Sequence, residues 1–244
     1  MGIDITVNGV VSFNPNHEKF VSTSVSFNPK LKNISVKGYR GNLLVYSVFT
    51  RMKSNDNRDG NPLIYAMKGL KGYSITFREI VKFKKNFKDI MGKVINHNGF
   101  DCDIILVIPS SSSVVKIFAR LVGFITGKQV IDDYFEKCTI DDVLINFNMN
   151  IVSKKDEDTI NGIIYTLTKL DGTKHFTLKH VRNNVRHYFQ PLKVRGGYNL
   201  NGKKILLVDD VLSTGTTFIN AHKLISNSAQ KIIAMSFLSD LSNY

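Results

Sequence analysis

Residues 205–217 read Ile-Leu-Leu-Val-Asp-Asp-Val-Leu-Ser-Thr-Gly-Thr-Thr, and this stretch decides the fold. Its first four residues are apolar and predict a strand that is buried on both faces, as strands of parallel sheets are. Two adjacent carboxylates, Asp209 and Asp210, end that strand. Small polar residues then predict a loop, and the pattern becomes helical from about Thr217 to Ser226. A buried strand, a short loop and a helix in this order indicate an α/β protein with a parallel sheet.

The loop after the two aspartates has the composition of an anion site. Backbone amides at a helix N-terminus bind anions, and Gly215 permits a close approach of the backbone. Four hydroxyl side chains add donors: Ser213, Thr214, Thr216 and Thr217. Carboxylates beside such a site repel a phosphate, but they accept hydrogen bonds from vicinal hydroxyl groups. A phosphorylated ribose carries both groups, and the alternative is a strand that ends in a solvated pair of aspartates.

The stretch 205–217 resembles the signature of type I phosphoribosyltransferases that binds 5-phosphoribosyl-1-pyrophosphate (PRPP). In that family four apolar residues, two acidic residues and a Thr-Gly loop hold PRPP. The resemblance implies that Asp209 and Asp210 bind the ribose hydroxyls. It also implies a 5′-phosphate site at Ser213, Thr214, Gly215, Thr216 and Thr217. The resemblance covers residues 104–240 and fades outside them.

An earlier strand and loop fit the pyrophosphate site of the same family. Residues 104–108 are apolar and are followed by Pro109 and a run of serines, Ser110, Ser111, Ser112 and Ser113. A helix from about Val114 to Thr126 comes next, so its N-terminus and the serine hydroxyls face an anion together. Lys116 and Arg120 are four residues apart, which predicts one helical face and a possible anion contact.

A third stretch, residues 178–189, is similar to the Arg-Asn-Val…Phe segment of the competence-protein (ComF-like) branch of the family. The adenine-type branch is the other close pattern. Arg182 and Arg186 lie four residues apart, and they contact the anionic ligand or form a solvated helix face. His180 and His187 have no acidic partner at the spacing of a catalytic triad or a metal site, so no catalytic role is assigned to them.

Members of the ComF-like branch often carry an N-terminal zinc module rich in cysteine. This chain has two cysteines, Cys102 and Cys138, which are too few for a zinc cluster or a disulfide framework. No apolar run reaches the roughly 18 residues of a membrane helix, and the first ten residues do not form a signal peptide. We therefore expect a soluble, cytoplasmic protein without membrane contact.

The 244 residues divide by pattern into two parts. Residues 1–99 predict a basic extension, β-rich up to about residue 50 and helical at 74–94, packed on the core. Residues 100–244 predict a twisted parallel sheet with helices on both faces and a hood at about 150–190. Within the hood we expect a hairpin over residues 163–178, which turns at Asp171-Gly172, and an exposed loop at Lys154 to Asp158. These two segments are expected to form a mobile cover over the ligand.

Positive charge is concentrated in the first 100 residues. They hold 16 basic and 6 acidic side chains, whereas the remainder holds 17 and 14. Such a field attracts nucleic acid or phosphorylated ligands, and a lysine-rich solvated surface is the alternative. Four aromatic residues near the lysines either stack on bases or belong to the core: Tyr39, Tyr73, Phe83 and Phe87.

The resemblance implies a reaction in which a nitrogenous base displaces pyrophosphate from C1 of PRPP. Mg²⁺ is then held through PRPP alone, or through PRPP and Asp209. No nucleophilic side chain is required, and no catalytic residue is assigned. Hypoxanthine-guanine enzymes place an aspartate where this chain has Ser213, which argues against a 6-oxopurine acceptor. A homodimer is a further expectation. The alternative is a non-catalytic regulator that senses PRPP or a nucleotide, or binds nucleic acid, on the same fold.

Overall fold

The computed structural model describes residues 1–35, 41–53, 61–178 and 181–241. Tyr39 and His180 lie outside these ranges. A mixed sheet runs through the centre, in the order β3-β5-β12-β11-β7-β8, with β4 paired to β5. Its strands are β3 (Val21–Ser22), β4 (Lys30–Ile34), β5 (Leu43–Arg51), β7 (Ile104–Val107), β8 (Gln129–Ile131), β11 (Lys204–Val211) and β12 (Lys231–Leu238). The expected α/β class, with a parallel sheet at its centre, is confirmed.

The central strand β11 is buried because it lies between two parallel neighbours. Leu206 pairs with Ile105 of β7, and Leu207 pairs with Ala234 of β12. Pairing with β7 ends at Val208, whereas pairing with β12 continues to Val211. The strand is therefore longer than the apolar run alone predicts, and both aspartates are part of its carboxyl end.

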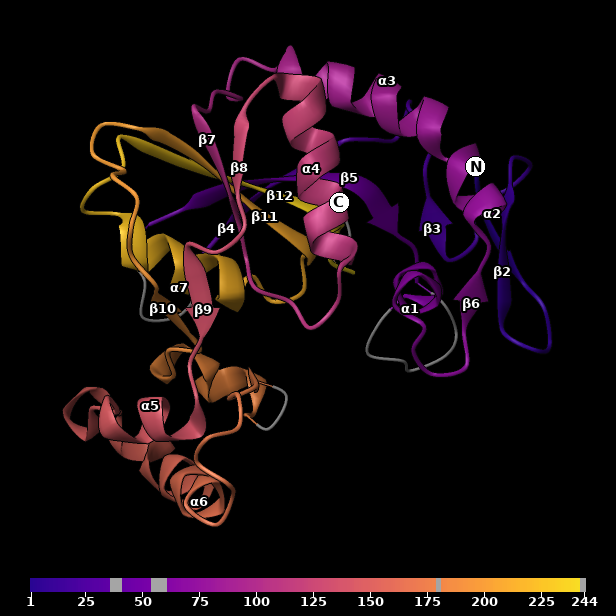
Figure 1. Cartoon of the computed structure of the whole chain (residues 1–244). Coiled ribbons are helices and arrows are strands. Elements are labelled where there is room, and N and C mark those ends of the chain that lie inside the picture. The colour runs from indigo at the N-terminus through magenta and orange to yellow at the C-terminus, as the bar shows by residue number, and fades with distance from the viewer. Residues whose placement is uncertain (36–40, 54–60, 179–180, 242–244) are drawn as a thin grey trace.

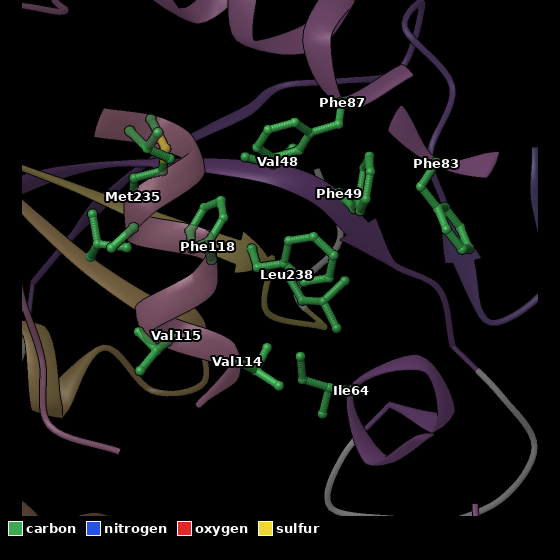
Figure 2. Close-up of a cluster of buried hydrophobic side chains, with 14 of the residues drawn as sticks. Val48, Phe49, Ile64, Phe83, Phe87, Val114, Val115, Phe118, Met235 and Leu238 are labelled. Carbon is green, nitrogen blue, oxygen red and sulfur yellow. The ribbon is translucent and has the colours of Figure 1, made fainter. Parts of the chain in front are cut away.

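Helices cover both faces of the sheet (Figure 1). On one face, α3 (Lys84–Ile95) and α4 (Val114–Thr126) pack on Leu206 and Val208. Figure 2 shows this cluster, in which the Phe118 ring lies 6.1 Å from that of Phe87. On the other face, α7 (Thr216–Ile225) packs on Leu207. The expected helices at 114–126 and 217–226 are confirmed within a residue.

The N-terminal part contributes directly to the central sheet. Val45 of β5 pairs in parallel with Ala234 of β12, so the parallel sheet is not confined to residues from about 100 onward. A separate small sheet is formed by β1 (Gly2–Ile5), β2 (Val10–Asn14) and β6 (Ser74–Ile75). The sheet thus crosses the expected boundary at residue 100, because β5 is buried along nearly its whole length, as a central strand is.

One short helix and one helix break in this part were not anticipated. Helix α1 (Pro62–Lys68) begins at Asn61, whose side chain accepts a hydrogen bond from the Leu63 amide. The expected helix at 74–94 is instead β6, then α2 (Phe77–Lys82), then α3. The chain turns at Phe83 because this ring enters the core, 5.0 Å from the ring of Phe13.

Three of the four aromatic residues near the lysines lie in the described ranges, and these three belong to the core. Tyr73, Phe83 and Phe87 are each less than 10% exposed, so they are not available to stack on bases. The lysines of α3 face solvent, and Lys85 forms an ion pair of 2.8 Å with Asp89. Nucleic-acid binding by this basic surface stays a prediction.

Residues 138–189 form a helical subdomain with its own hydrophobic cluster. It contains α5 (Ile140–Ile145), α6 (Glu157–Leu167) and the short helices η1 (Met149–Ile151), η2 (Lys154–Asp156) and η4 (Asn183–Tyr188). Two antiparallel strands, β9 (Phe135–Lys137) and β10 (Leu192–Val194), connect it to the core (Figure 1).

The expected hairpin at 163–178 is wrong. Ile160 and Leu167 lie seven residues apart on the buried face of α6, and this spacing is helical. The Asp171-Gly172 turn is present, but it follows a helix. The segment Lys154 to Asp158 is exposed as expected, apart from Asp156, but it is not a loop, because η2 and the start of α6 occupy it. Asp156 is buried and accepts hydrogen bonds from Ser153 and Tyr188.

None of the helices in the described ranges is long and apolar enough to span a lipid bilayer.

Candidate functional site

The loops that follow β7 and β11 lie side by side at one edge of the sheet. The two strands are parallel neighbours, and Val107 pairs with Val208 at their carboxyl ends. The Ser110 hydroxyl, which follows β7, donates a long hydrogen bond of 3.4 Å to Oδ2 of Asp210 on β11. Open α/β sheets bind their ligands outside the carboxyl ends of the strands. The structure thus brings together the expected ribose and pyrophosphate elements.

The loop of residues 213–217 has a backbone that requires glycine at one position. Gly215 caps α7 with a φ of 76°, in the left-handed region. A Cβ atom at this position would lie 2.6 Å from Cδ1 of Ile34. The glycine therefore serves both the turn and the close packing of the loop against β4.

Several hydrogen-bond donors of this loop lie close together. Ser213 and Thr214 are exposed, and the hydroxyls of Thr214 and Thr216 lie 2.9 Å apart. Thr216 and Thr217 open α7, and the first N–H groups of a helix have no partner within it. The loop therefore combines hydroxyls, backbone amides and a helix N-terminus, which suits an anion.

The two aspartates of the signature differ in their surroundings. Asp209 accepts a hydrogen bond of 2.8 Å from the Asp210 amide, and its own carboxyl is enclosed by the fold. Burial first, and the charge of Asp210 second, raise the pKa of Asp209 well above its usual range. Nearby charges of Lys68 and Lys137 act in the opposite direction. At Asp209 burial and the Asp210 charge outweigh the two lysines, so a further cation or a hydroxyl donor would stabilise the ionised form of Asp209.

Lys68 is a site residue that the sequence did not indicate. Its ammonium group forms an ion pair with Oδ2 of Asp210, and the two side chains are only 16% and 9% exposed. Lys68 is the last residue of α1, and Gly69 in the left-handed region ends that helix. The Lys-Gly pair is a helix stop signal, but nothing local to it identifies the distant partner.

The serine loop after β7 is organised by its own side chains. The Ser110 hydroxyl accepts from the Ser112 amide at 3.3 Å, and the Ser112 hydroxyl accepts from the Val114 amide at 3.2 Å. Ser111 and Ser113 are exposed, and Ser113 makes no side-chain cap. The loop therefore presents hydroxyls and amides beside Asp210, and its pyrophosphate role stays a prediction.

The two basic residues of α4 share a helical face, as predicted, because both pair with Asp132. The distances are 3.2 Å for Lys116 and 3.8 Å for Arg120. Both side chains are exposed. Their contact with a bound anion stays a prediction, and in this structure both pair with Asp132.

Arg182 and Arg186 do not act as one face. Arg186 donates through Nε to the carbonyl oxygen of Val181 at 2.9 Å. Arg182 is exposed and lines a cavity of about 440 Å³ along α6, with Gly162 and Thr166 among the lining residues. Arg182 precedes the 3₁₀ helix η4 with a ψ of 141°, whereas Arg186 lies within that helix, so the two do not share a helical face.

A second cavity, of about 380 Å³, lies between the loop of residues 213–217 and the helical subdomain. Thr214 and Thr216 line it from the core. The other lining residues are Ser35, Lys155, Asp156, Asn183, Asn184 and His187. The lining is polar and carries both signs of charge. Sequence reasoning did not include the subdomain residues, because their meeting with Thr214 depends on tertiary structure.

The cysteines are buried, and burial raises the pKa of Cys102 to about 11 and that of Cys138 above its usual value. Within the described residues no group of three or more His, Cys, Asp or Glu side chains is arranged to hold a metal ion.

Neither a family model nor a curated protein matches this chain. Among solved structures, it is similar to the adenine phosphoribosyltransferase of Leishmania donovani, with 10% identity over 98% of this chain and 75% of that one, and a TM-score of 0.38. It is also similar to the enzyme of Trypanosoma brucei, solved with AMP, pyrophosphate and ribose-5-phosphate. The identity is 11% over 100% of this chain and 89% of that one, and the TM-score is 0.40. For the enzyme of Thermoanaerobacter pseudethanolicus the identity is 12% over 66% of this chain and 85% of that one, and the TM-score is 0.35. All three TM-scores lie below 0.5.

Proposed function

We propose that this protein binds PRPP at the carboxyl ends of β7 and β11 and transfers its phosphoribosyl group to a nitrogenous base. One observation carries the proposal. The aspartate pair, the loop 213–217 and the serine loop meet at one edge of the sheet, where Ser110 contacts Asp210. A sugar with a phosphate at one end and a pyrophosphate at the other matches that order of acceptors and donors.

Each part of the ligand would have its own partners. The 5′-phosphate would accept hydrogen bonds from the hydroxyls of Thr214 and Thr216 and from the first amides of α7. The ribose hydroxyls would donate to Asp209 and Asp210, since charged acceptors form the stronger hydrogen bonds. The pyrophosphate would lie on the serine loop at the N-terminus of α4.

Mg²⁺ fits this site as a group shared with the ligand. Carboxylate oxygens are ligands that Mg²⁺ prefers, and Mg²⁺ is usually bound by one or two carboxylates plus substrate phosphates. Burial and the neighbouring charge of Asp210 raise the pKa of Asp209 despite the nearby lysines, so a bound cation would stabilise its carboxylate. When bound, Mg²⁺ would supply neutralisation of the pyrophosphate charge, and the carboxylate that would hold it is Asp209.

The reaction needs positioning more than side-chain chemistry. A lone pair on the base nitrogen forms the bond to C1, and the C1–O bond breaks with its electrons leaving on pyrophosphate. The protein holds the two reactants in line and stabilises the departing charge with fixed donors. Ser213 stands where an acidic residue would assist a 6-oxopurine, so we propose an acceptor of another class.

The helical subdomain would choose the acceptor. Asn183 and Asn184 each carry amide donors and acceptors beside the phosphate loop, and such groups discriminate the edge of a heterocycle. The subdomain also covers this side of the cavity, which would shield the reaction from water.

The test is release of pyrophosphate from Mg-PRPP in the presence of each of a panel of bases, with adenine, orotate, uracil and hypoxanthine in separate reactions. The proposal expects turnover with one base other than hypoxanthine. Tight PRPP binding without turnover would instead favour the non-catalytic regulator. Absence of PRPP binding would contradict both.

A further inference from the structure

Lys68 is a partly buried cation beside the two aspartates, and it comes from neither of the two loops at the site. It ends α1, and its ion pair with Asp210 places this end of the helix at the site, although the two are far apart in sequence. Its ion pair with Asp210 is largely closed to solvent on both sides. A lysine placed there affects every ligand that must use Asp210.

Lys68 competes with a ribose hydroxyl for the same acceptor atom. Oδ2 of Asp210 already accepts from the Lys68 ammonium and, at 3.4 Å, from the Ser110 hydroxyl. A hydroxyl that donates to this oxygen must replace Lys68 or share the atom with it. A buried ammonium that loses its acid is strongly disfavoured unless it gains another acceptor.

The serine loop shows where a new acceptor would lie. Lys68 and Ser110 contact the same oxygen, so the ammonium lies beside the loop on which we place the pyrophosphate. PRPP would therefore bring a new anionic partner for Lys68 together with the hydroxyls that displace it. Ribose 5-phosphate brings the hydroxyls and the 5′-phosphate without the pyrophosphate.

We propose that Lys68 is a positioning residue that couples binding of the ribose to binding of the pyrophosphate, so that the site selects PRPP over ribose 5-phosphate. This inference rests on the proposed function. It makes the N-terminal part of the chain a component of the site. The coupling is a free energy between two groups, so it must appear equally from either side.

The experiment measures the Kd of ribose 5-phosphate by calorimetry, with and without inorganic pyrophosphate at constant Mg²⁺. We expect pyrophosphate to tighten ribose 5-phosphate binding to the wild-type protein by a factor in the range of about 5 to 150, as coupled sites do. In Lys68→Met this factor should fall close to one. The variant should also bind PRPP more weakly and ribose 5-phosphate as well as, or better than, the wild type.

The matched control is Lys71→Met, which removes a lysine three residues further on. Lys71 donates to the hydroxyl of Tyr65, and among the residues that the structure describes it forms no ion pair with Asp209 or Asp210. It should keep the wild-type coupling factor. Should Lys68→Met fail to fold, Lys68→Gln keeps a hydrogen-bond donor for Asp210 without the charge and is measured instead.

Two outcomes would overturn the inference while leaving the proposed function intact. One is a wild-type protein that binds PRPP but shows no coupling between pyrophosphate and ribose 5-phosphate. The other is equal coupling, or an equal preference for PRPP over ribose 5-phosphate, in the wild type and the Lys68 variant. Failure of the wild-type protein to bind PRPP would instead contradict the proposed function itself.

Discussion

The sheet edge and the helical subdomain meet at the cavity beside Thr214 and Thr216, yet they are built differently. The edge is fixed by strands whose central residues are fully buried, and each strand pairs with neighbours on both sides. The subdomain has a separate core and joins the sheet through two strands of three residues each. We infer that the edge provides rigid anion binding, whereas the subdomain is the part that can move over the ligand and vary with it.

Cavities made in the two cores should separate the two regions. Leu207 of β11 and Ile160 of α6 are both fully buried. Truncation of either to Ala is expected to cost about 2–5 kcal/mol. Leu207→Ala should lower protection from hydrogen exchange throughout the protein, because the central sheet is common to it. Ile160→Ala should raise exchange in residues 138–189 and leave β11 protected.

The same exchange measurement tests closure of the subdomain. Addition of Mg-PRPP to the wild-type protein should slow exchange in residues 138–189. An unchanged profile at saturating ligand would remove the cover from the account. Equal loss of protection everywhere in both cavity variants would show that the two regions unfold as one.

A substitution of Gly215, in the loop of residues 213–217, should lower the free energy of unfolding more than the same substitution at a helix end. Gly215→Ala places a side chain at positive φ and against Ile34, and we expect a loss of about 2–4 kcal/mol from strain and overpacking together. The control is Gly127→Ala at the end of α4, which has a φ of 67° but nothing within 4 Å of the added atom. It should lose only about 1–2 kcal/mol. Urea unfolding measures both, and equal losses would contradict the close packing.

Asp209 should make stability fall as the pH rises. Burial and the charge of Asp210 raise the pKa of Asp209, so the folded protein holds a proton that the unfolded chain has released. This contribution is full below the ordinary aspartate pKa and is lost as the pH rises through the raised pKa. Asp209→Asn should flatten that part of the profile, measured by urea unfolding from about pH 5 to about pH 8. An unchanged slope would show that Asp209 ionises normally.

The edge could be predicted from the sequence because its signals are local. The serine run, the apolar repeat from Val114 and Gly127 mark the beginning, buried face and end of α4. The apolar run before Asp209 likewise predicts β11 and the loop that follows. The residues expected at this edge therefore meet where the pattern placed them.

The other parts of the fold and the site could not be predicted from local patterns, or were predicted wrongly from them. The Asp171-Gly172 turn was interpreted as a hairpin, although the spacing of Ile160 and Leu167 indicates a helix. Lys68 could not be found, because its ion pair joins two segments distant in sequence. Arg182 and Arg186 diverge because Arg182 precedes a short 3₁₀ helix that contains Arg186, and no α-helix joins them.

The most direct test of the central claim is calorimetric binding of Mg-PRPP to the wild-type protein and to the double variant Asp209→Asn, Asp210→Asn. The matched control, Asp101→Asn with Asp103→Asn, removes two carboxylates at the opposite end of the same strands, where both contact Lys204. We predict binding by the wild type and the control, and a loss of about 1–3 kcal/mol for each charged hydrogen bond removed in the signature variant. Equal PRPP affinity in the signature variant and the wild type would contradict the assignment of this edge as the ribose site.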